Sequence, residues 1–132
     1  MKRTKQPSEH QIQSAYFEWV RLTYPGCKLI YAVPNGGKRH IVTAMKMKAE
    51  GVTPGVPDVN IDIPRAYGHI IFHGMRIETK SAKGTTSEEQ DLAILQLISC
   101  QYRVVVCNST EMMIAATKDY LKGWKWNAPE AI

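Results

Sequence analysis

The segment 51–80 constrains the fold most, because it contains two stretches in which apolar and polar residues alternate. These stretches are residues 58–63 and 75–80, and an alternation with a period of two is typical of a β-strand with one buried face. Turn-forming residues between Pro64 and Gly68 separate them. The sequence therefore predicts that the two stretches pair as antiparallel strands.

The polar faces of these strands carry charged groups. Glu78 and Lys80 are two residues apart, so their side chains point to the same side of the strand. Counting back from the turn places Asp58 opposite residues 75–78, whereas Asp62 lies opposite an earlier part of that strand. We therefore expect Asp58, and not Asp62, to be the partner of Glu78.

Two carboxylates and a lysine on neighbouring strands suit a metal-dependent phosphodiesterase. Carboxylate oxygens bind hard cations such as Mg²⁺, and a lysine ammonium can stabilise or help to deprotonate an attacking water. A structural interpretation competes with this one. Pro57-Asp58 is a common turn dipeptide, and Glu78 and Lys80 could form a solvated ion pair worth a few tenths of a kcal/mol.

Length and composition narrow the class of protein. A chain of 132 residues suits one compact domain. No apolar run is long enough to span a bilayer, and the basic N-terminus lacks the apolar segment of a secretory signal, so we expect a cytoplasmic protein. The three cysteines have no C-x-x-C spacing. This predicts reduced, mostly buried thiols and neither a disulfide framework nor a zinc site.

The positive charge is concentrated in the first half of the chain. The net charge is +5, but residues 1–57 hold nine basic and three acidic side chains, whereas residues 58–132 hold eight and nine. Such an asymmetry suits a surface that binds a polyanion. An excess of charge that only improves solubility fits equally well.

The first helix is predicted over residues 9–22, after a basic tail of residues 1–7. Ser8 and Gln11 form a capping box, and apolar residues then recur at helical spacing. Glu9 lies about 60° from the centre of the apolar stripe, so its carboxylate could face inward and join a metal site. Alternatively, Glu9 only favours the positive end of the helix dipole.

A strand over residues 28–33 leads into the loop Pro34–Arg39, which is rich in glycine and basic residues. Contact between this loop and phosphate groups is one interpretation, and a plain solvated turn is the other. A second helix over residues 39–50 follows, with Ile41 and Met45 on one side. The residues expected to contact nucleic acid are Asn35, Gly36, Lys38, Arg39, Lys46 and Lys83.

The last third of the chain predicts a polar loop at residues 81–86, a helix, a strand and a final helix. Ser87 and Gln90 form a second capping box, and Gln90, one loop beyond Lys80, could also contact a metal-bound water or a phosphate. The run 102–107 is apolar and β-branched, which is typical of a strand buried on both faces beside a parallel neighbour. Thr110 is the expected cap of the last helix. The fold class is therefore α/β, with a mixed sheet flanked by helices.

Several motifs follow one another along the chain. They are Pro34-Asn35-Gly36-Gly37, Lys48-Ala49-Glu50-Gly51-Val52-x-x-Gly55-Val56-Pro57-Asp58, Glu78-x-Lys80-Ser81 and Ser87-x-x-Gln90. Together they resemble a known family, the VRR-NUC nuclease domains of the PD-(D/E)xK superfamily. The resemblance extends over most of the chain and is to the small stand-alone members from bacteriophages and bacteria. It implies a restriction-endonuclease-like domain at residues 8–123, between tails at residues 1–7 and 124–132.

The resemblance also implies a site and an activity. Asp58, Glu78, the backbone carbonyl of Thr79 and Glu9 would bind Mg²⁺ or Mn²⁺, Lys80 would orient or activate water, and Gln90 would assist. The activity implied is hydrolysis of DNA by a metal-dependent deoxyribonuclease. Small members of the family look like homodimers that cut branched DNA such as four-way (Holliday) junctions.

Two alternatives remain open from the sequence. A nuclease with the same chemistry could act on nicks, flaps or duplex DNA. A DNA-binding module without catalysis would use the basic first half of the chain, although it would not need Asp58, Glu78 and Lys80 together.

Overall fold

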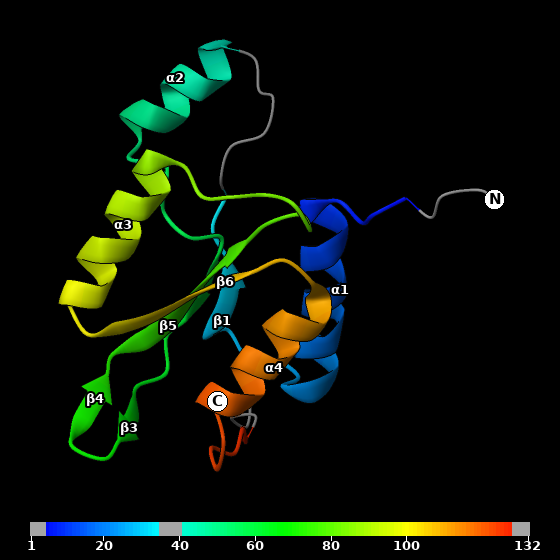
Figure 1. Ribbon diagram of the computed structural model, residues 1–132, viewed down its shortest axis with the longest axis vertical. Helices are drawn as coiled ribbons and strands as arrows, with labels where there is room; N and C mark the ends of the chain where they lie inside the picture. Colours follow the sequence, from blue (N-terminus) through cyan, green and yellow to red (C-terminus); the bar gives the residue numbers. More distant parts are fainter. Residues whose placement is uncertain (1–4, 35–40, 128–132) are drawn as a thin grey trace.

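The computed structural model describes residues 5–34 and 41–127, and Figure 1 shows the arrangement of its helices and strands. Both predicted capping boxes are present, because Ser8 and Ser87 each bind the backbone three residues later. The described elements are, in chain order, α1 (Glu9–Thr23), β1 (Ile30–Ala32), α2 (Ile41–Ala49), β2 (Val59–Ile61), β3 (Arg65–Tyr67), β4 (Ile70–Phe72), β5 (Gly74–Thr79), α3 (Glu88–Ser99), β6 (Tyr102–Cys107) and α4 (Thr110–Tyr120).

The central sheet has the strand order β1-β2-β5-β6. The pairs β1–β2 and β2–β5 are antiparallel, and β6 runs parallel to β5, so the predicted mixed sheet is confirmed. Val59 pairs with Ile77, and this register places Asp58 at the level of Glu78, as the alternation predicted. The connection from β2 to β5 is more than a turn, because β3 and β4 form a small hairpin of their own within it.

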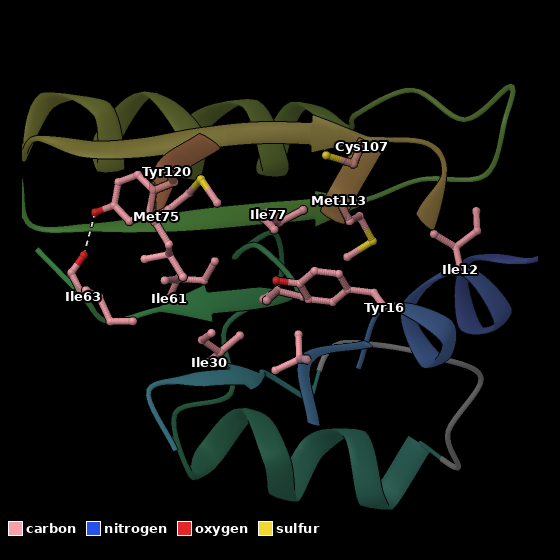
Figure 2. Packing of buried hydrophobic residues seen from close by; sticks show 13 residues of the cluster. Ile12, Tyr16, Ile30, Ile61, Ile63, Met75, Ile77, Cys107, Met113 and Tyr120 are labelled. Atoms are coloured by element: carbon pink, nitrogen blue, oxygen red, sulfur yellow. Dashed lines mark hydrogen bonds between the residues drawn. The ribbon is translucent and has the colours of Figure 1, made fainter. Parts of the chain in front are cut away.

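The hydrophobic core lies on one face of the sheet, beneath α1 and α4 (Figure 2). Apolar side chains of β2 and β5 meet the buried faces of these two helices there. Tyr16 and Thr117 share a buried hydrogen bond of 2.8 Å between their hydroxyl groups, and the Tyr120 hydroxyl donates to the Ile63 carbonyl at 2.7 Å. The core is therefore held by specific polar contacts as well as by apolar burial.

The opposite face of the sheet is covered by α3 and is packed less completely (Figure 1). No residue of α3 is buried. The prediction that residues 102–107 are buried on both faces is wrong, because β6 is an edge strand and Val106 is 42% exposed. The parallel neighbour predicted for residues 102–107 is present, and it is β5. The cap of α4 is Ser109 rather than Thr110, whose hydroxyl instead donates to the carbonyl of Ile12.

Helix α2 has no buried residue and lies apart from α1 and α4 (Figure 1). The predicted start of this helix at Arg39 falls outside the described residues, as does most of the loop Pro34–Arg39. Within the described part, Ile41 and Met45 are exposed.

The segment after α4 folds back onto α1. Trp124 packs against Tyr24 and the core, and the Trp126 indole donates a 2.7 Å hydrogen bond to the Pro25 carbonyl. These tryptophans therefore belong to the folded body. The cysteines are free, but only Cys107 is buried, so the expectation of mostly buried thiols is wrong. In the part of the chain that the structure describes, no helix has the length and apolar character needed to cross a membrane.

Candidate active site

The site forms where β2 begins and β5 ends. Asp58 directly precedes β2, and its backbone carbonyl accepts a hydrogen bond from Val33 at 2.8 Å. Its carboxylate Oδ2 accepts a second hydrogen bond, also 2.8 Å long, from the backbone N–H of Thr79. Asp58 is thus fixed between the edge strand β1 and the end of β5, at the level of Glu78.

Glu78 is a buried acidic residue that the strand alternation places beside Asp58. Its side chain is 3% exposed, and its Oε1 accepts a 2.8 Å hydrogen bond from Nε2 of Gln90. Lys80 Nζ lies 3.8 Å from the same oxygen. Among the described residues, the other oxygen, Oε2, is buried and has no hydrogen-bond partner. A buried carboxylate oxygen without a donor is unfavourable unless a cation or a proton joins it.

Electrostatics around Glu78 favour its protonated form when no cation is bound. The pKa of Glu78 is raised to about 8, first by burial of the carboxyl and next by the negative charge of Asp58. Lys80 opposes this shift. The charge of Glu9 adds to it, as does the hydrogen bond that the Glu78 and Asp58 carboxyls can share only when one of them is protonated. The carboxyls of Glu78 and Asp58 are therefore close enough for the charge of one to affect the protonation of the other.

Gln90 caps α3 as predicted, and it also contacts Glu78. Its Oε1 accepts the backbone N–H of Ser87 at 2.8 Å, which completes the capping box of α3. Its Nε2 donates to Glu78, so the same side chain holds the first turn of α3 against the site. The side-chain amide of Gln90 consequently positions both the start of α3 and the carboxyl of Glu78.

The loop before Asp58 is fixed against the same helix. Gly55 has a φ of +87°, and a Cβ at this position would lie 2.7 Å from the backbone carbonyl group of Glu89. Only glycine permits both this backbone conformation and so close an approach. The contact sets the path of the chain from Gly55 to Asp58.

Glu9 lies near the site but is exposed on the first turn of α1. It lines a groove between α1 and β1 that reaches Asp58. Within the described residues, no three His, Cys, Asp or Glu side chains are gathered closely enough to hold a metal ion. The structure thus brings Asp58 and Glu78 together, while Glu9 acts on Glu78 through its charge.

Other residues of this groove were missed by the sequence analysis. Gln13 accepts a long 3.4 Å hydrogen bond from the Thr79 hydroxyl, and it lies one helical turn after Glu9. This i, i+4 spacing could have indicated it. Arg21 and Lys28 also line the groove and give it positive charge, but no local pattern distinguishes them from other surface cations.

The residues expected to contact nucleic acid are only partly described. Lys46 on α2 and Lys83 in the loop after β5 are both exposed, as such a role requires. Asn35, Gly36, Lys38 and Arg39 lie outside the described residues.

The oxygen donors present fit a hard divalent cation. Asp58 and Glu78 supply two carboxylates, and the unpaired Oε2 of Glu78 needs a positive partner. Mg²⁺ and Mn²⁺ prefer oxygen ligands and retain several waters, so two carboxylates and a backbone carbonyl can suffice. The side chain of Thr79 faces the core, toward Sδ of Met113, which leaves only its backbone available to the site.

Comparisons with known proteins identify the domain family and a similar fold. The model of the VRR-NUC domain family matches residues 3–111. A solved structure titled "VRR_NUC domain protein" is similar to this chain with a TM-score of 0.71 and 24% sequence identity. The alignment covers 96% of this chain and 98% of the other, so the two chains share a fold over nearly their whole lengths. Among curated proteins, no significant match is found.

Proposed function

Because this chain belongs to the VRR-NUC domain family, a family of nuclease domains, we propose that it is a Mg²⁺- or Mn²⁺-dependent DNA endonuclease. The observation that carries the metal dependence is the buried, unpaired Oε2 of Glu78 beside Asp58. Lys80 lies on the same side of the sheet, as in the Asp, Glu-x-Lys arrangement of PD-(D/E)xK nucleases.

The protein groups have distinct tasks in this proposal. Asp58, Glu78 and the Thr79 carbonyl would hold the cation, and Glu9 would approach it from α1. Mg²⁺ or Mn²⁺ would supply positive charge that neutralises phosphate oxygens and makes a nearby water more acidic. Lys80 would orient that water and stabilise the charge that develops on the phosphate, while Gln90 holds Glu78 in place.

The substrate proposed is DNA, and within DNA a branched molecule such as a four-way junction. The basic first half of the chain and the exposed Lys46 and Lys83 support binding to a polyanion. A four-way junction has two-fold symmetry, and a homodimer would place two sites on it symmetrically. We therefore propose a homodimer as the active form.

The test is a cleavage assay with four-way junction, flap, nicked duplex, intact duplex and single strand. Each DNA is incubated with the chain and Mg²⁺, Mn²⁺, Ca²⁺ or EDTA. We expect cleavage with Mg²⁺ or Mn²⁺, most rapid on the junction, and none in EDTA. Asp58→Asn keeps an acceptor for the Thr79 N–H and Lys80→Met keeps the length of the side chain, and both should lose at least about 100-fold in rate.

The control is Lys118→Met, which removes an exposed lysine on α4 remote from Glu78 in the sequence and should leave cleavage unchanged. Cleavage that persists in Asp58→Asn or Lys80→Met would reject the site. Salt-sensitive binding without cleavage by any divalent ion would instead identify a DNA-binding module. Equal cleavage of all substrates would reject the preference for branched DNA while leaving the chemistry intact.

A further inference from the structure

Helix α2 carries an apolar face that this chain leaves exposed. Ile41 and Met45 are 70% and 65% exposed, and no residue of the helix is buried. Nine residues are too few for a helix to be stable in water without tertiary contacts. Ile41, Met45 and Lys48 follow the spacing i, i+4, i+7, so they lie along one face of α2.

Helix α3 has a matching exposed face on the side away from the sheet. Leu92, Leu95 and Ile98 are between 53% and 66% exposed, which is unusual for three large apolar residues on one helix. Glu88, Leu92 and Leu95 again follow the spacing i, i+4, i+7. The face of α3 therefore has an acidic end and an apolar middle, whereas the face of α2 has an apolar start and a basic end.

We infer that α2 of one copy packs antiparallel against α3 of a second copy of this chain. An antiparallel register that sets Ile41 beside Leu95 also sets Met45 beside Leu92. The same register brings Lys48 to Glu88, so apolar and charged positions match along both helices. We name this contact the α2–α3′ interface.

A two-fold axis makes the contact reciprocal. If α2 of the first copy covers α3 of the second, then α2 of the second covers α3 of the first. The apolar faces of α2 and α3 are both buried by the same operation, so neither of these two faces is left to bind a third copy. Lys46 is two residues from Lys48 and lies on the other side of α2, so it stays available for nucleic acid.

This inference assigns a surface to the homodimer of the proposed function and rests on that part of it. It is independent of the nuclease chemistry, because Asp58, Glu78 and Lys80 take no part in the α2–α3′ interface. Its test needs no DNA and no divalent ion, so failure of the interface and failure of the nuclease proposal give different results.

The experiment measures association by sedimentation of the full chain in EDTA, over nanomolar to micromolar concentrations. One variant carries Ile41→Glu and Met45→Glu, and the other carries Leu92→Lys and Leu95→Lys. A dimer made of either variant alone has unpaired charges against apolar side chains in both of its α2–α3′ contacts. We therefore expect the dimer dissociation constant to rise at least about 100-fold. These side chains are exposed in the single chain, so circular dichroism should show that both variants stay folded.

Mixing the two variants gives the decisive result. A mixed dimer pairs two glutamates with two lysines in one contact and retains the native apolar pairs in the other. We therefore expect the mixture to dimerise although neither variant does so alone. Leu22→Lys is the control, since Leu22 is the most exposed apolar residue of α1 and lies outside the interface; it should leave association unchanged.

Three outcomes would overturn the inference. These are a wild-type chain that sediments as a monomer at all concentrations, variants that dimerise as tightly as the wild type, and variants whose mixture stays monomeric.

Discussion

The backbone N–H of Thr79 donates a 2.8 Å hydrogen bond to Oδ2 of Asp58, and this bond joins the two strands that carry the acidic residues. Asp58 could otherwise rotate away from Glu78, because two neighbouring carboxylates repel each other. The donor is a backbone N–H, that of the residue between Glu78 and Lys80, so no further side chain is needed to hold Asp58 in place. It explains how a threonine can occupy this position while its own side chain packs into the core.

Gln90 should be required for catalysis beyond its role as a helix cap. Gln90→Ala removes the bond to Ser87 and the bond to Glu78, whereas Gln11→Ala removes the equivalent capping bond of α1 and touches no acidic residue. Both variants should lose about 1 kcal/mol of unfolding free energy in urea titrations. Only Gln90→Ala should also cut DNA more slowly, and equal rates for the two variants would contradict the role in the site.

The stability of the metal-free protein should fall as the pH rises from about 5 to 8. The pKa of Glu78 is raised to about 8 in the folded state, so in this range the folded chain holds a proton that the unfolded chain releases. Ionisation of Glu78 changes the free energy of unfolding by at most about 1.4 kcal/mol per pH unit. Glu78→Gln cannot ionise and should lose this part of the slope, as urea titrations in EDTA at several pH values would show.

Binding of a divalent ion should release a proton near neutral pH. A cation at the site requires ionised Glu78, and at pH 7 that residue is mostly protonated because its pKa is about 8. Calorimetric titration with Mn²⁺ in two buffers of different ionisation enthalpy measures the number of protons released. Release of close to one proton is expected at pH 7, with tighter binding at pH 8.5. Binding that does not depend on pH would place the ion away from Glu78.

Gly55→Ala should damage both stability and activity. The new Cβ would lie 2.7 Å from the backbone carbonyl group of Glu89, in addition to the strain of a φ near +87°. Gly51→Ala is the matched control, because Gly51 has a φ of +93° but its Cβ would meet nothing within 4 Å. Gly51→Ala should cost only about 1–2 kcal/mol. Gly55→Ala should cost more in urea titration and should also slow cleavage, because it moves the loop that positions Asp58.

Much of the fold followed from local patterns. Alternation identified β2 and β5, and the count from the turn gave the register that sets Asp58 opposite Glu78. Capping boxes located α1 and α3 because the box is made by residues three positions apart. The capping role of Gln90 was also predicted, whereas its hydrogen bond to Glu78 was not, because that contact depends on how α3 packs against the end of β5.

The errors came from features that depend on distant parts of the chain. The run 102–107 is as apolar as a central strand, but its exposure depends on whether another strand pairs beyond it, and none of the described strands does. The exposure of the apolar side of α2 could not be predicted, because whether a packing partner exists in the same chain is not encoded in the helix itself. The groove residues Arg21 and Lys28 come together only through the fold.

The proposed nuclease activity requires a divalent ion that would be held by the carboxylates of two neighbouring strands. Crystals of the chain soaked in Mn²⁺ and measured at a wavelength where manganese scatters anomalously would locate that ion directly. We predict one strong anomalous peak within bonding distance of carboxylate oxygens of Asp58 and Glu78, absent in crystals of Asp58→Asn. A peak elsewhere, or carboxyls that remain without an ion at saturating Mn²⁺, would contradict the proposed site.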